Sequence, residues 1–83
     1  MEEFRVSSKS VPSSLGGAVA MTLGSGEEAV LSCIGAAAVN QAVKACAVAN
    51  ERLGGGLVFV PTFENAEING ETVSAIKILC KKG

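Results

Sequence analysis

The sequence predicts an α/β fold, a two-layer α/β sandwich with the element order β-α-β-α-β-β, over a single domain of residues 1–83. Three observations predict it. Short apolar or alternating segments, typical of strands, are interleaved with two longer segments of helical periodicity. Glycine or proline stands at most of the boundaries. The last two strand segments flank Asn69-Gly70, a pair that strongly favours a tight hairpin. A chain of 83 residues has room for one hydrophobic core.

The first strand is indicated by alternation around Phe4 and Val6, which we expect to point inward. Residues 8–11 form a short connection. Pro12 suits the first turn of a helix, where its missing N–H costs nothing, and Ser10 is placed to cap that turn.

The helix that follows presents one apolar face and ends at the glycines of residues 24–26. That face consists of Leu15, Ala18, Val19, Thr22 and Leu23. Gly16 and Gly17 in its middle each cost about 1 kcal/mol relative to alanine. Their presence predicts the close approach of another backbone.

Residues 29–34 are nearly continuous in apolar character, which predicts a central strand. After Gly35, a helix is expected over residues 37–53. A strand is expected over residues 57–63, and because it passes Pro61 we expect it at a sheet edge or with a bulge. A last strand is expected over residues 72–80, with a hairpin register that places Phe59, Pro61 and Phe63 opposite Cys80, Ile78 and Ile76.

Polar residues of the second helix fall on a narrow ribbon at about 3.6 residues per turn. Asn40, Lys44 and Glu51 share one stripe, with Gln41 and Arg52 beside it. The wider apolar face is expected to turn toward the sheet, and it comprises Ala38, Val39, Ala42, Val43, Ala45, Cys46, Ala49 and Leu53. Such a small, semi-polar ribbon suits contact with another subunit or with a sugar-phosphate backbone, or it is an ordinary exposed stripe.

Composition limits the function classes. The chain is 48% hydrophobic with a net charge of −1, so we expect uncovered apolar surface, self-association, and no general basic surface for nucleic acid. There is no His, no Cys pair at metal-binding spacing and no phosphate-cradling glycine loop before a helix, so we expect no enzyme, no metal and no cofactor. Cys33, Cys46 and Cys80 are expected to be buried and reduced, in a soluble cytoplasmic protein without a membrane segment.

The first connection is the best candidate binding site. Ser7, Ser8, Lys9, Ser10 and Ser13 offer hydroxyls and one ammonium beside a helix N-terminus, where an anion is favoured. The alternative is that the serines only stabilise the turn, with Lys9 solvated. Asn40 and Gln41 lie in the first turn of the second helix, near the place where that anion would sit, and Lys44 follows them.

Three segments carry a family resemblance: FRVSSKSVPSSLGGAVA, IGAAAVNQAVKACAVA and VPTFENAEINGETVSAIKI. Together they resemble the stage V sporulation protein S family of bacteria, which looks related to the Alba chromatin and RNA-binding proteins. The resemblance implies an Alba-like fold, dimerisation and nucleic-acid binding. Alba proteins place a phosphate-contacting lysine in the first connection, and here only Lys9 stands there. Their basic hairpin arm is replaced by Glu64, Glu67 and Glu71.

Two functions follow from these observations. The first is a small regulatory protein that binds RNA or DNA phosphates as a dimer through the connection and the polar ribbon. Its expected contact residues are Ser7, Lys9, Ser10, Ser13, Asn40, Gln41 and Lys44. The second is a protein-interaction or oligomerisation module that does not touch nucleic acid, a function that the acidic pI of about 5.3 favours.

Overall fold

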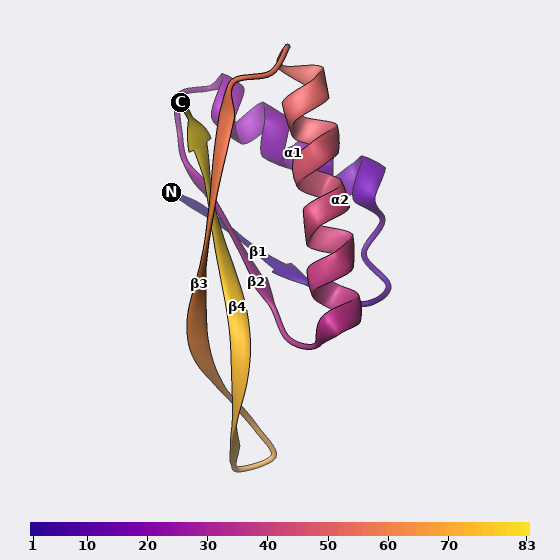
Figure 1. The fold of residues 1–83 in the computed structure, drawn as a ribbon, viewed down its shortest axis with the longest axis vertical. Helices are drawn as coiled ribbons and strands as arrows, with labels where there is room; N and C mark the ends of the chain where they lie inside the picture. Colours follow the sequence, from indigo (N-terminus) through magenta and orange to yellow (C-terminus); the bar gives the residue numbers. More distant parts are fainter.

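The computed structural model describes all residues 1–83, with the strands and helices in the predicted order. Helices α1 (Pro12–Gly24) and α2 (Ala36–Arg52) cover one face of a four-stranded sheet and leave the other face open (Figure 1). The predicted two-layer α/β sandwich is therefore confirmed. The two helices fall short of the length and hydropathy that crossing a membrane requires.

The sheet has the strand order β1-β2-β4-β3, with β1 (Glu2–Val6) parallel to β2 (Ala29–Cys33). Strand β2 lies inside the sheet, as its continuous apolar sequence predicts. Strand β3 (Leu57–Ile68) lies at the edge, as predicted from Pro61, which cannot donate a ladder hydrogen bond.

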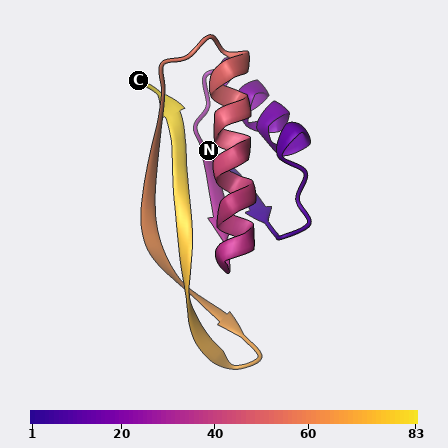
Figure 2. The same ribbon diagram turned by 45° about the vertical axis from the view of Figure 1, so that its right-hand side comes forward.

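Strands β3 and β4 (Glu71–Lys82) form a long hairpin that projects beyond the rest of the sheet (Figures 1 and 2). We call residues 62–76 of this hairpin the arm. The predicted register is confirmed, with Phe63 opposite Ile76. The turn residues Asn69 and Gly70 both have positive φ, 51° and 80°, as a two-residue hairpin turn requires. Both strands run further than predicted, so the molecule reaches 41 Å along its longest axis.

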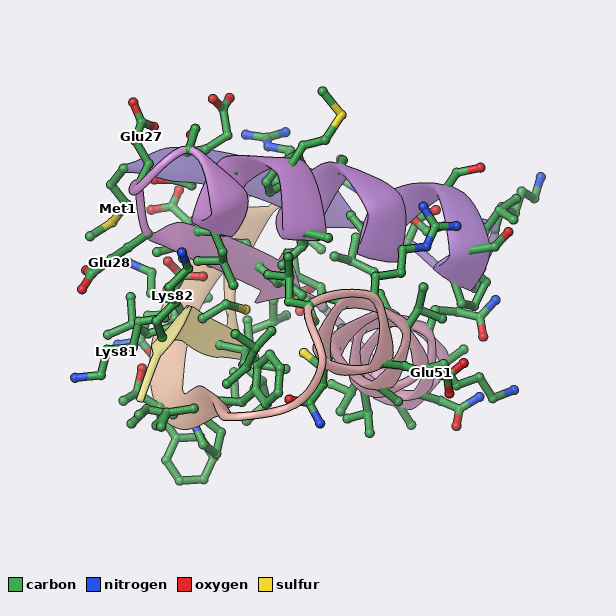
Figure 3. The ribbon with its side chains drawn as sticks, turned by 90° about the horizontal axis from the view of Figure 1, so that it is seen from above. Met1, Glu27, Glu28, Glu51, Lys81 and Lys82 are labelled. Carbon is green, nitrogen blue, oxygen red and sulfur yellow. The ribbon has the colours of Figure 1, made fainter.

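Helix α1 runs across α2 when the molecule is viewed along its long axis (Figure 3). At the crossing, a Cβ atom added to Gly16 would lie 2.6 Å from Cβ of Val48 and 2.7 Å from the carbonyl oxygen of Ala45. No residue larger than glycine fits there without movement of the backbone. The close approach predicted from Gly16 is thus confirmed.

The core beneath the helices is made of small and medium apolar side chains. Helix α2 contributes only Ala and Cys to the fully buried set, namely Ala38, Ala42, Ala45, Cys46 and Ala49. The largest fully buried side chains, Leu23, Leu31 and Val19, come from α1 and β2. Small side chains on α2 let it lie close to the sheet and to α1.

Two predictions about side-chain placement are wrong. Ser10 does not cap α1: the N-cap is Val11, without a side-chain hydrogen bond. Ser10 instead accepts a hydrogen bond from the Ser7 N–H, because the connection folds back on itself. Val43 does not face the sheet, since 55% of its surface is exposed, and Leu53 is exposed as well. The alanines of α2 already fill the contact with α1 and the sheet, so Val43 lies on the outward side.

The crossing at Gly16 yields a stability prediction. Gly16→Ala should lower the free energy of unfolding by about 1–3 kcal/mol, because the new methyl group overpacks the contact with α2. In Gly17→Ala, the new Cβ meets only the end of the Arg52 side chain, at 2.8 Å. This control should be neutral, or more stable by up to about 1 kcal/mol through helix propensity. Urea denaturation measures both, and equal effects of the two substitutions would contradict the packing described here.

Candidate functional site

The candidate site lies at one end of the sheet. Because β1 and β2 are parallel, their carboxyl ends meet at the same edge. The connection of residues 7–11 and the start of α2 therefore lie at this end, and the arm projects from it (Figure 1). Three segments that are distant in sequence thus surround one region of the surface.

Two of the serines in the connection are used to shape it. The Ser7 N–H donates to Oγ of Ser10 at 2.9 Å, and the Lys9 N–H donates to Oγ of Ser7 at 3.1 Å. The Ser10 N–H closes the turn onto the Ser7 carbonyl oxygen at 3.1 Å. These hydroxyls stabilise the turn, as the alternative from the sequence anticipated. The side chains of Lys9 and Ser13 are exposed and make no hydrogen bond or ion pair within the chain.

Gln41 joins the connection to α2. Its Nε2 donates to the carbonyl oxygen of Ser10 at 2.9 Å in a partly buried contact. The structure therefore brings Gln41 against the serine-lysine connection. Asn40 and Lys44, the other two ribbon residues of the candidate site, are exposed on the outward side of α2 and have no partner in the chain.

Both helix N-termini near the site are uncapped. Neither Val11 at the start of α1 nor Gly35 at the start of α2 supplies a side-chain hydrogen bond. The first backbone bonds are donated by Leu15 and Val39, so the N–H groups that precede them in each helix are free. The positive end of each helix dipole and these donors favour an anion such as phosphate.

A groove of about 930 Å³ runs between the ends of β1 and β2, the start of α2 and the arm. Of the candidate residues in and next to the connection, Ser7 and Ser8 line it, whereas Lys9, Ser10 and Ser13 do not. Sequence reasoning missed Arg5 and Ser32, which also line it and lie opposite each other in the β1–β2 register. The signal was their common position one residue before the ends of two parallel strands. The sequence alone, however, does not show that the arm forms the opposite wall of this groove.

The wall that the arm provides is acidic. Glu64 and Glu67 line the groove together with Glu3 of β1, against the single cation Arg5. Lys77 pairs with Glu64, with its Nζ 3.5 Å from the carboxylate oxygen. This groove carries more negative than positive charge, which disfavours phosphate inside it.

The model of the stage V sporulation protein S (SpoVS) family matches residues 2–82 of the chain. The chain belongs to the SpoVS family. The match takes in every strand and both helices, so the connection, the ribbon of α2 and the arm are all part of the family domain. Membership marks this SpoVS chain as a small sporulation-related protein.

Asn50 of this SpoVS domain has a local structural role. Its Oδ1 accepts a hydrogen bond from the Leu57 N–H at 3.1 Å, which fixes the end of α2 to the start of β3.

The three cysteines of the SpoVS domain are free and belong to the core, as predicted. Burial raises the pKa of the Cys33 thiol. The neighbouring thiol of Cys80 lowers the pKa of Cys46, and the neighbouring Cys46 together with burial raises the pKa of Cys80. No group of three or more His, Cys, Asp or Glu side chains comes together as a metal site would.

The Gln41 contact gives a second prediction. Gln41→Ala should lower the free energy of unfolding by about 1 kcal/mol, because the Ser10 carbonyl loses its partner. Amide hydrogen exchange in residues 8–11 should become faster at the same time. Asn40→Ala, one residue earlier and exposed, is the control and should change stability by less than about 0.5 kcal/mol. If the two variants behave alike, Gln41 does not hold the connection.

Proposed function

We propose that this member of the SpoVS family is a non-enzymatic regulatory protein of the cytoplasm that binds the phosphates of RNA or DNA as a homodimer. One observation carries the proposal: the exposed ammonium of Lys9 stands in a rigid turn next to the uncapped N-terminus of α1. Lys9, with the free N–H groups and hydroxyls of Ser13 and Ser14, offers a phosphate several donors at one place.

The rigidity of the turn supports this assignment. Since Ser7 and Ser10 bond to the backbone of the connection, and Gln41 ties it to α2, the turn is held before any ligand arrives. Binding then costs little ordering of the loop. Ser7, Ser10 and Gln41 act by positioning Lys9 and Ser13, while Asn40 and Lys44 lie on the neighbouring surface of α2.

Dimerisation compensates for the lack of net positive charge on a single chain. A net charge of −1 gives one copy little long-range attraction for a polyanion. A dimer carries two Lys9 sites on one particle, so the second phosphate contact becomes intramolecular and the combined affinity rises. The buried, unpaired thiols of all three cysteines support a reducing compartment.

A second candidate function, an oligomerisation module without nucleic-acid binding, is favoured by a specific observation. Phe63 on the arm is 85% exposed and Val43 on α2 is 55% exposed. Apolar side chains this open often mark protein contact surfaces. The acidic residues Glu67 and Glu71 of the arm are exposed as well, which disfavours a nucleic-acid groove around the arm.

Lys9→Glu tests the nucleic-acid proposal. Affinity for labelled single-stranded RNA and for duplex DNA should fall about tenfold or more, because an attractive phosphate contact becomes a repulsive one. Fluorescence anisotropy at two salt concentrations measures it, and wild-type affinity should decrease as salt rises.

Lys82→Glu is the matched control. Lys82 is exposed near the C-terminus, at the end of the sheet opposite to the connection that carries Lys9. This variant has the same net charge as Lys9→Glu and should retain most of the binding. Equal losses in both variants, or no wild-type binding at micromolar protein and low salt, would overturn the proposal in favour of the oligomerisation module.

A further inference from the structure

The outward side of α2 is covered by no other element of the chain. Helix α1 lies on one side of it and the sheet on another, and its remaining side faces solvent (Figures 1 and 3). Five exposed residues occupy this side, and we call them the outer face of α2: Asn40, Val43, Lys44, Ala47 and Glu51. Packing within the chain does not explain why these residue types occur on the outer face.

Apolar and small residues form a seam along the outer face. Asn40, Val43 and Ala47 recur at spacings of three and four residues, the spacing of a helix that packs against another helix. Ala47 is small enough for a second backbone to approach closely. Val43 is the one large apolar side chain of the seam, and more than half of its surface is exposed.

Two opposite charges flank the seam on the same side. Lys44 and Glu51 lie two helical turns apart, about 10.5 Å along the axis. Neither takes part in an ion pair within the chain. Around a two-fold axis placed midway between them, Lys44 of one copy meets Glu51 of the other, and the reverse pair forms at the same time. The charge pattern of the outer face is therefore complementary to itself in the antiparallel orientation.

We propose that a second copy of this chain docks on the outer face of α2, with the two α2 helices antiparallel and two reciprocal Lys44–Glu51 pairs across the axis. The inference rests on the homodimer of the proposed function and specifies its interface. The outer face carries one cation and one anion, so it has no net charge to attract a polyanion. In this arrangement Lys44 belongs to the contact between copies, while Lys9 remains the phosphate ligand.

Apolar surface continues from the seam toward the arm. Val39 and Phe63 line a shallow pocket of about 390 Å³ together with Ala36 and Ile76. Val39 precedes Val43 by one helical turn, so this pocket adjoins the apolar edge of the outer face. An antiparallel second copy would cover it in the same step, which adds the exposed ring of Phe63 to the buried area.

Charge reversal tests the inference with matched variants. Lys44→Glu places four carboxylates at the dimer axis, and Glu51→Lys places four ammonium groups there. Each variant alone should weaken dimerisation about tenfold or more, as measured by sedimentation velocity across a concentration series. An equimolar mixture of the two should recover dimers, since every pair across the axis is again of opposite sign. The double variant should also dimerise like the wild type.

Circular dichroism checks that each variant remains folded, which the exposure of both positions favours. Wild-type dimerisation of both single variants, a mixture that stays monomeric, or a monomeric wild type would each overturn the interface. Nucleic-acid binding is followed in parallel by anisotropy. If the interface is wrong while Lys9→Glu still abolishes binding, the phosphate site stands alone. If the mixture rescues dimers but no nucleic acid binds, only the proposed function fails.

Discussion

The close approach of α1 and α2 at Gly16 is the constraint on which the other features of this domain depend. The backbone of α1 lies against Ala45 and Val48 of α2, so close that no side chain larger than that of glycine fits between the two helices at Gly16. Their contact lets alanines line the buried side of α2. It also fixes where α1 begins, and hence where the connection from β1 lies. Gln41 then bonds to the Ser10 carbonyl because the two segments are already held together.

The same packing explains why α2 has an outward side with a distinct character. The alanines satisfy the contacts with the sheet and α1, so Val43 and the polar ribbon remain on the surface. Their charges are balanced, whereas the connection carries the free cation Lys9 and the arm carries an excess of carboxylates. The surface thus separates a cationic turn, a neutral helix face and an acidic arm. We infer that the cationic turn binds phosphate and that the neutral helix face binds a second copy of the chain.

The sequence was sufficient for the features that local chemistry determines. The strand order along the chain, the edge position of the strand with Pro61, the hairpin register at Asn69-Gly70 and the glycine contact in α1 were all predicted correctly. Each depends on a residue with a restricted backbone or a missing side chain. The backbone geometry that such residues impose or permit follows directly from their identity, so the sequence is enough to predict it.

Features that depend on tertiary packing could not be predicted in this way. Val43 has the hydropathy of a core residue, and only the presence of α1 on the neighbouring side places it outward. Ser10 was a plausible helix cap, but its hydroxyl serves a turn that forms between Ser7 and Ser10. The groove with Arg5 and Ser32 forms because residues 64–68 of the arm face the ends of β1 and β2, a long-range contact that no short-range pattern encodes.

The proposed function depends on phosphate binding at the connection and at the adjoining N-terminus of α1. Amide chemical shifts of the isotope-labelled protein, recorded during titration with a short single-stranded RNA, test it most directly. The largest changes are expected in residues 8–14 and at Gln41, which bonds to the Ser10 carbonyl, with saturation that weakens as salt increases. Changes confined to the arm, residues 62–76, or the absence of any change at low salt would contradict it.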